Sequence, residues 1–187
     1  MNKRKGFTLI ELIVSISVVM ILASIGVPVL ASFIVELRVD NEISSICRLL
    51  FITRNTAINE NKTVTLCPLN NQNICENQWQ NTLSVFIDSN NNKIYEPATG
   101  ERLIKVKPPI FTGDILQYGN TRNGLTYSAT GHLSCWGQNA TFKYCPKNYN
   151  EKSRGIVVAV SGRIYTSSDD NNTQVDKNRS GVTITCT

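Results

Sequence analysis

The chain has 187 residues, of which 18% are charged, and a formal net charge of +5 at pH 7. Lys3, Arg4 and Lys5 supply three of its 19 cations, and without them the balance is 16 − 14 = +2. Such a nearly neutral chain lacks the electrostatic footprint of a nucleic-acid-binding protein. The single histidine, His132, and the lack of a nucleophile elbow argue against an enzyme, so we expect neither catalysis nor a cofactor.

An uncharged segment runs from Leu12 to Val35, which is 35 − 12 + 1 = 24 residues. As a helix it would be about 36 Å long, and a bilayer core needs about 20 such residues. We therefore predict a membrane-spanning helix over residues 7–35. Three cations precede it and no comparable basic cluster follows closely, so the positive-inside rule puts Met1 in the cytoplasm and residues 36–187 on the far side.

Glu11 lies at the start of this apolar segment. A carboxylate inside a membrane is costly unless it meets a partner, so Glu11 is a candidate functional residue. The small residue Gly6 comes before the apolar run, whereas the cleavage site of an ordinary signal peptide comes after it.

Residues 5–11 read Lys5-Gly6-Phe7-Thr8-Leu9-Ile10-Glu11 and resemble the class III signal peptide of type IV prepilins and type II secretion pseudopilins. The resemblance implies a leader, residues 1–6, that the prepilin peptidase removes after Gly6, and N-methylation of the new terminus at Phe7. It also implies that Glu11 pairs with the Phe7 amino group of a neighbouring subunit, in a filament built by an inner-membrane assembly platform. The alternative is a plain membrane anchor with an isolated glutamate.

The helix is expected to continue to about residue 60, and Pro28 should kink it without ending it. Beyond Val35 there are 187 − 35 = 152 residues, which suits one domain. Steps of three and four residues predict one apolar helical stripe. Its members are Val39, Ile43, Ile46, Cys47 and Leu50, and the apolar residues Ala57 and Ile58 follow further along the helix.

After Asn59 the apolar residues alternate with polar ones, which predicts short strands. Ser161-Gly162 suggests a tight hairpin between two of them. We expect an α+β fold in which a β-sandwich or two small sheets pack against the helix. The predicted strands are residues 63–66, 83–87, 102–106, 125–127, 140–144, 156–160, 163–165 and 182–184.

A second set of motifs resembles the GspH/FimT family of minor pilins and pseudopilins. It comprises Arg54-Asn55-Thr56-Ala57-Ile58, Val64-Thr65-Leu66-Cys67-Pro68, Trp79, Val85-Phe86-Ile87-Asp88-Ser89-Asn90 and Glu101-Arg102-Leu103-Ile104. The resemblance implies a type IV pilin fold, with a long N-terminal helix packed on an antiparallel β-sandwich.

The same resemblance implies a minor pilin that helps to initiate and assemble a type IV pilus with other minor pilins and the major pilin. It implies a single-pass inner-membrane protein with residues 36–187 in the periplasm, later incorporated into a filament. The alternatives are the minor pseudopilin H of a type II secretion system and a DNA-binding pilin for natural transformation.

The six cysteines all lie on the expected exported side, where disulfides form. Zinc is disfavoured because the chain has no C-x-x-C pair and one histidine. Cys67 and Cys75 flank a turn-rich loop that they are expected to close. Resemblance to minor pilins that tie down their C-terminus suggests Cys145–Cys186. The remaining two, Cys47 and Cys135, either pair or stay free.

Asp88-Ser89-Asn90-Asn91-Asn92 resembles the start of a calcium loop, but Lys93 stands where glycine is needed and Thr99 where glutamate is needed. An asparagine-rich turn is the preferred interpretation, and no metal site is expected.

Gly162-Arg163-Ile164-Tyr165 resembles half of the Gly-Arg-x-Arg motif of DNA-binding pilins, which makes Arg163 a DNA-binding candidate. Tyr165 replaces the second arginine, and the charges from Arg163 to Thr187 cancel, so we expect no functional DNA binding. Another basic stretch in the domain comprises Lys143, Lys147, Lys152 and Arg154.

Overall fold

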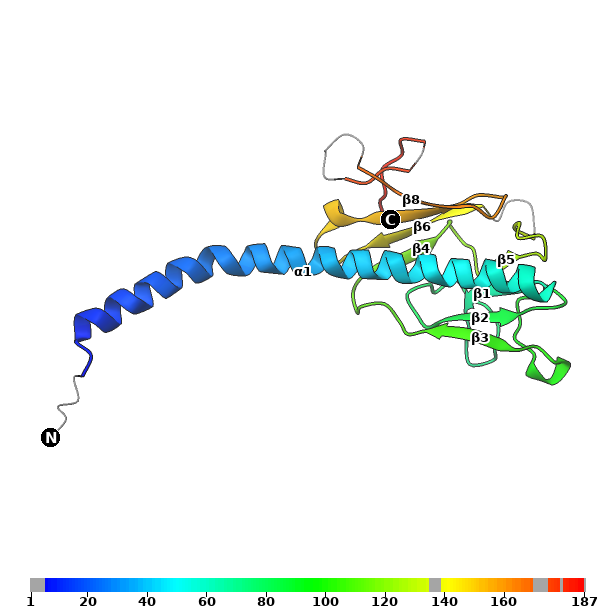
Figure 1. Cartoon of the computed structure of the whole chain (residues 1–187), viewed down its shortest axis with the longest axis horizontal. Coiled ribbons are helices and arrows are strands. Elements are labelled where there is room, and N and C mark those ends of the chain that lie inside the picture. Colours follow the sequence, from blue (N-terminus) through cyan, green and yellow to red (C-terminus); the bar gives the residue numbers. More distant parts are fainter. Residues whose placement is uncertain (1–5, 135–138, 170–174, 179, 187) are drawn as a thin grey trace. The chain divides into compact units, whose positions relative to one another are not determined.

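A computed structural model gives the fold and describes residues 6–134, 139–169, 175–178 and 180–186 (Figure 1). Contacts divide the chain into two compact units, one up to Arg38 and one from Val39 onward. The helix α1 (Leu9–Glu60) begins in the first unit and ends in the second. Two short 3-10 helices, η1 (Pro97–Thr99) and η2 (Asn150–Lys152), lie in the second unit.

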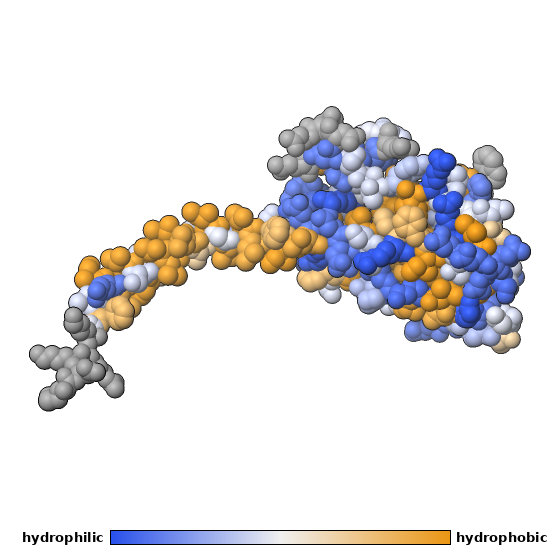
Figure 2. Space-filling view, viewed as in Figure 1, coloured by the Kyte–Doolittle hydropathy of each residue, from blue (hydrophilic) through white to orange (hydrophobic). Residues whose placement is uncertain are grey.

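The first unit consists of the apolar part of α1. The helix passes through Pro28 without ending and stops at Glu60, as predicted. From Leu9 to Ala31 its side chains are exposed on all sides, with Met20 65% and Leu22 67% exposed (Figure 2). Within the described part of the chain, α1 is the one helix long and apolar enough to cross a membrane.

In the second unit, one face of α1 is buried and forms the helical side of the core. Four of the five predicted stripe positions are buried, and Cys47 is half-buried; further along the helix, Ala57 is buried and Ile58 is 44% exposed. Leu49 and Thr53 are buried in addition. The Thr53 hydroxyl donates to the Leu49 carbonyl oxygen at 2.7 Å, which satisfies this polar group without a partner outside the helix. The buried residues are Val39, Ile43, Ile46, Leu49, Leu50, Thr53 and Ala57.

Two four-stranded antiparallel sheets pack with this helix (Figure 1). In spatial order, the first contains β3 (Leu103–Lys107), β2 (Leu83–Ile87), β1 (Val64–Pro68) and β5 (Leu125–Tyr127). The second contains β4 (Ile115–Tyr118), β6 (Ala140–Cys145), β7 (Arg154–Val158) and β8 (Ile164–Thr166). The α+β fold is therefore confirmed, in the form of two small sheets.

The strand predictions were wrong at two places. β4 was missed, although Gly113 and Gly119 bound it and Leu116 and Tyr118 alternate toward the core. Residues 182–184, predicted as a strand, form only an isolated bridge between Thr183 and Lys177. The reason is that Ile184 packs against the face of β7 instead of extending a sheet edge: a Cβ on Gly155 would lie 2.8 Å from its Cδ1.

An aromatic cluster joins the two sheets. Trp79, from the connection between β1 and β2, contacts Tyr118 and Phe142 of the second sheet edge-on, with ring centroids 5.2 and 5.1 Å apart. Tyr118 and Phe142 stack at 4.1 Å. The Trp79 indole N–H donates to the Arg122 carbonyl oxygen at 2.6 Å, so its one polar atom is satisfied. Burial raises the pKa of Tyr118, as expected for a phenol within this core.

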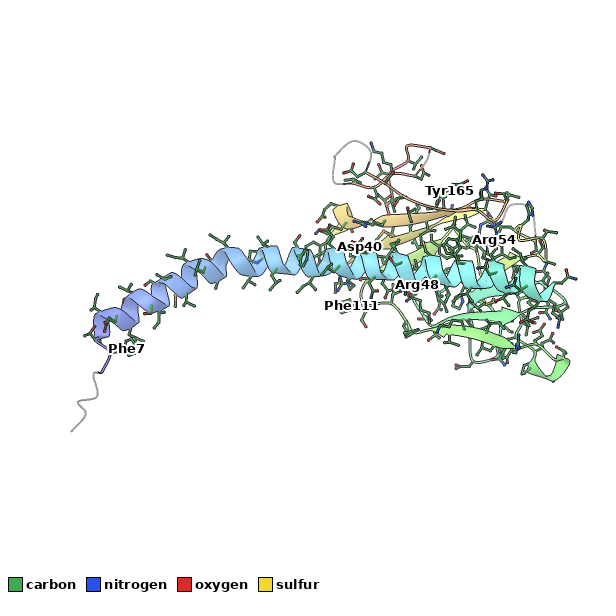
Figure 3. All side chains as sticks on the ribbon, in the orientation of Figure 1. Phe7, Asp40, Arg48, Arg54, Phe111 and Tyr165 are labelled. Carbon is green, nitrogen blue, oxygen red and sulfur yellow. A yellow bond between two sulfur atoms is a disulfide. The ribbon has the colours of Figure 1, made fainter. Side chains whose placement is uncertain are left out.

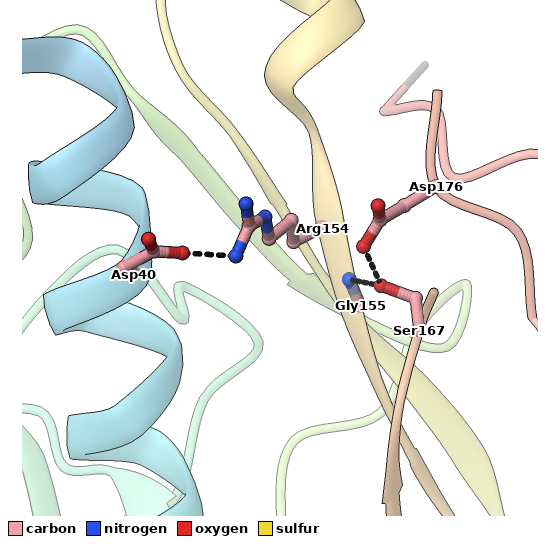
Figure 4. Close-up of polar contacts among 5 residues, drawn as sticks. All are labelled: Asp40, Arg154, Gly155, Ser167 and Asp176. Atoms are coloured by element: carbon pink, nitrogen blue, oxygen red, sulfur yellow. Dashed lines mark hydrogen bonds and ion pairs between the residues drawn. The ribbon is translucent and has the colours of Figure 1, made fainter. Parts of the chain in front are cut away.

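Ion pairs tie α1 to both sheets. Glu42 pairs with Lys107 of β3 at 2.7 Å, and the two side chains are only 18% and 7% exposed. Asp40 pairs with Arg154 of β7 (Figure 4). The helix and the sheets are thus connected by charge as well as by apolar contact.

Among the residues that the structure describes, two disulfides join cysteines that were expected to pair. Cys67–Cys75 closes the loop after β1, with Cα atoms 5.5 Å apart. Cys145–Cys186 ties the C-terminal tail to β6, with Cα atoms 6.1 Å apart.

Of the remaining two cysteines, which were expected either to pair or to stay free, the structure describes only Cys47. Cys47 is a free thiol, and Cys135 lies outside the described residues. The loop at Gly131 is held to α1 by the Arg54 side chain, which donates to the Gly131 carbonyl oxygen at 3.0 Å. Arg54 lies seven residues beyond Cys47, which is about 10 Å along the helix. Burial raises the pKa of the Cys47 thiol, which disfavours the reactive thiolate.

Replacing Glu42 tests the buried ion pair. Glu42→Ala leaves the Lys107 ammonium buried without its counter-ion, so the free energy of unfolding should fall by about 3–5 kcal/mol. The matched control is Glu60→Ala, which removes the partner of the 61% exposed Arg102 side chain and should cost at most about 1 kcal/mol. Urea unfolding of residues 36–187 measures both, and equal losses would contradict the account.

Replacing Cys186 tests the C-terminal disulfide. The bridge spans a sequence separation of 41, so Cys186→Ser should lower the free energy of unfolding by about 3–4 kcal/mol. Cys47→Ser, at a free thiol, is the control and should change it far less. Non-reducing peptide mapping should find the linked Cys145 and Cys186 peptides; a Cys186 that reacts with a thiol reagent before reduction would show that the pairing is wrong.

Candidate processing and assembly site

The junction between Gly6 and Phe7 is exposed and lies outside the helix. Phe7 is 87% exposed, and α1 begins two residues later, at Leu9 (Figure 3). A Cβ added to Gly6 would meet no atom within 4 Å. The fold of the subunit therefore does not require glycine here, and any need for a small residue comes from whatever binds this segment.

Glu11 caps its own helix in the isolated subunit. Its Oε2 accepts hydrogen bonds from the Thr8 backbone N–H at 2.8 Å and from the Thr8 hydroxyl at 2.9 Å. The Glu11 N–H donates back to the Thr8 hydroxyl oxygen at 3.3 Å. This is a capping box, which satisfies donors that a helix start leaves unpaired. Sequence reasoning missed it, although a threonine three residues before a glutamate is its signal.

Three of the four serines of the apolar segment donate their hydroxyls to carbonyl oxygens of the same helix. Ser15 donates to the Glu11 carbonyl oxygen at 2.6 Å, Ser17 to Ile13 at 2.8 Å and Ser24 to Ile21 at 2.8 Å. Because each bond stays within the helix, these hydroxyls do not need water. The segment is thus suited to an apolar environment on every side.

The Gly162-Arg163 turn is shaped by the fold. Gly162 has φ +75° and is buried, and a Cβ there would lie 2.0 Å from the Gly131 carbonyl oxygen. Only glycine fits this close approach. Arg163 itself is exposed at the turn between β7 and β8. Packing against Gly131 is therefore enough to account for Gly162, and this glycine is no evidence for a DNA-binding motif.

The other basic stretch is not an open cationic surface. Arg154 pairs with Asp40, and the Lys143 ammonium donates to the Thr185 carbonyl oxygen at 3.0 Å. Two of the four cations are thus bound to their own chain, while Lys147 is exposed. Proteins bind DNA electrostatically when several of their cations neutralise phosphates and release counterions. This basic stretch offers few cations that could do so.

Asp88 organises a loop with its carboxylate. It is fully buried and accepts bonds from the Thr65 hydroxyl at 2.7 Å and from the N–H groups of Asn92 and Lys93 at 3.0 and 3.1 Å. Its oxygens therefore hold the asparagine-rich turn. In the described ranges, no three histidine, cysteine, aspartate or glutamate side chains gather as metal ligands would.

Two family models match the chain. The prokaryotic N-terminal methylation motif matches residues 1–27, which contain Gly6, Phe7 and Glu11. The family described as type II transport protein GspH matches residues 42–162, which is 162 − 42 + 1 = 121 of the 187 residues. No curated protein matches the chain in sequence.

Two crystal structures of the type IV minor pilin FimU from Pseudomonas aeruginosa strain PAO1 have a similar fold. In space group P21 the identity is 15% and the TM-score 0.56, over 70% of this chain and 88% of FimU. In space group P65 the identity is 18% and the TM-score 0.51, over 67% and 89%. The matched fold is a long helix packed on antiparallel sheets. With the GspH match over more than half of its length, the chain belongs to the GspH family and has the type IV pilin fold.

Proposed function

We propose that the chain is a minor pilin that helps to initiate and assemble a type IV pilus. It is cleaved after Gly6, N-methylated at Phe7 and held in the inner membrane by α1 until it enters a filament. The observation that carries this proposal is the apolar surface of α1 up to Ile34, which the chain itself leaves exposed.

Exposed apolar surface of this extent needs a partner. In a bilayer the lipid tails cover it, and in a filament the helices of neighbouring subunits do so. Extraction from the membrane is therefore unfavourable unless neighbours take the place of lipid. Because neighbouring helices replace lipid around α1, the other pilins are the main partners. The prepilin peptidase and the inner-membrane assembly platform act before the subunit enters the filament.

Glu11 supports the same proposal. A carboxylate among apolar side chains needs a cation nearby, and cleavage after Gly6 creates one at the Phe7 amino group. Oε2 is engaged by Thr8, whereas Oε1 accepts no bond from any residue that the structure describes. Oε1 is thus the oxygen that a neighbour's amino terminus would meet without breaking the cap.

The disulfides support a periplasmic location for residues 36–187. Cys67–Cys75 and Cys145–Cys186 belong to an oxidising compartment. The cations Lys3, Arg4 and Lys5 before the apolar segment favour the same orientation.

A second candidate is a minor pseudopilin of a type II secretion system. The matching family is that of the type II transport protein GspH, which favours it, whereas the similarity to the fold of the minor pilin FimU favours the pilus. Both use the same assembly chemistry. Deleting the gene separates them, because loss of surface pili with normal secretion supports the pilus, and loss of secretion with normal piliation supports the pseudopilus.

Variants of Glu11 and Thr8 separate assembly from capping. Glu11→Gln keeps a hydrogen-bond acceptor for Thr8 but removes the charge, so filament incorporation should fall while membrane insertion persists. Thr8→Ala is the matched control: it weakens the cap by about 1 kcal/mol but keeps the charge, so incorporation should continue. The readout is the amount of the chain in sheared filaments relative to the membrane fraction.

Either of two results would contradict the role of the charge. One is wild-type incorporation of Glu11→Gln. The other is an equal defect in both variants, which would assign Glu11 to helix capping alone.

A further inference from the structure

The end of the second unit that contains Asp40 and Glu42 also holds two loops. Lys107, which pairs with Glu42, ends β3 and leads into the connection to β4, residues 108–114. Arg154, which pairs with Asp40, begins β7 and follows the connection from β6, residues 146–153. These two loops therefore lie at the same end of the domain, and Figure 3 shows Phe111 at the level of Asp40.

Phe111 and Ile115 are exposed at this end, by 55% and 46%. A turn presents Phe111, because the Asp114 N–H donates to its carbonyl oxygen at 3.1 Å. The Asp114 carboxylate is buried and accepts bonds from the Tyr144 hydroxyl and from the Lys147 N–H, the latter at 2.9 Å. A buried and satisfied carboxylate thus fixes the turn that carries the partly exposed Phe111 side chain.

One exposed cationic side chain, that of Lys147, lies at the turn that holds this aromatic residue. The Lys147 stem lies along the turn, since a Cβ on Gly113 would be 2.8 Å from its Cδ. An aromatic side chain beside a lysine, whose stem is apolar and whose ammonium group reaches water, is typical of a membrane interface.

The chain keeps this end close to any membrane that contains the apolar segment. Val35 is the last residue of the uncharged run, and Asp40 is five residues later. Even a fully extended chain covers only about 18 Å in five residues. This limit comes from connectivity alone.

We propose that Phe111, Ile115 and Lys147 form a docking surface for an anionic phospholipid bilayer. Phe111 enters the headgroup region, and Lys147 meets the lipid phosphates. One aromatic and few cations bind weakly from solution, but the tether raises the local concentration of lipid so that weak contacts suffice. The docked domain stays bound to the membrane surface until the subunit enters a filament. This inference rests on the membrane insertion proposed above.

The test uses the full chain in vesicles of phosphatidylcholine and phosphatidylglycerol with brominated acyl chains, which quench nearby tryptophan. Phe111→Trp places the probe in the docking surface. Ile58→Trp is the matched control, since Ile58 is 44% exposed and lies 18 residues beyond Asp40, about 27 Å along α1. The signal of the two native tryptophans is measured in the parent chain and subtracted. The headgroup region of a bilayer is only about 5–10 Å deep, so a probe at residue 58 should lie beyond the reach of the brominated chains. The fluorescence of Phe111→Trp should therefore be quenched at least about twofold more than that of Ile58→Trp.

Adding Lys147→Gln to Phe111→Trp, or removing phosphatidylglycerol, should reduce this quenching. Equal quenching at both probe positions would overturn the docking. Docking would also be overturned if the Phe111→Trp probe were shielded from solvent only at a high protein-to-lipid ratio, because a second copy of the protein would then cover it. Flotation of the same vesicles is scored first. A chain that does not float overturns membrane insertion and with it this inference, whereas a floating chain with an unquenched probe overturns the docking alone.

Discussion

Six apolar side chains and Thr53 on one face of α1 are buried because two antiparallel sheets share a single helix as their core partner. The buried pair Glu42–Lys107 links that helix to the first sheet, and the pair Asp40–Arg154 links it to the second. Trp79 then joins the sheets to each other. The second unit thus covers the apolar face of α1 from Val39 onward. The apolar side chains of α1 up to Ile34 are not covered by other parts of the chain. This exposed apolar surface is the reason for proposing that the protein lies first in a membrane and then in a filament.

The C-terminal tail is held by several different interactions, and it lies beyond the GspH match, which ends at residue 162. Cys186 is bonded to Cys145, and Ile184 is buried against Gly155 of β7. The Ser167 hydroxyl accepts a bond from the Gly155 N–H at 2.7 Å and donates to Asp176 at 2.5 Å (Figure 4). The tail therefore closes the outer face of the second sheet, and the disulfide secures contacts that are already specific.

Much of the fold could be predicted because its signals are local. Three patterns can be recognised from neighbouring residues alone: the 24-residue uncharged run, the apolar stripe with helical spacing, and the alternation of β-branched with polar residues. The failures lie where tertiary contacts decide. β4 was missed although Leu116 and Tyr118 alternate toward the core, and Ile184 looks like a strand residue but packs against Gly155 of β7. At the assembly site, Glu11 was predicted from the cost of a charge in lipid, but its capping of Thr8 was overlooked.

The central claim is that this chain becomes an assembly subunit when a new amino terminus is created at Phe7. Intact mass spectrometry of the protein extracted from cell membranes measures this most directly. The account predicts a chain that begins at Phe7 and carries one additional methyl group, and that retains residues 1–6 when a bulky residue replaces Gly6. A mature protein that keeps Met1-Asn2-Lys3 would contradict it, because the amino group that Glu11 is proposed to meet would never form.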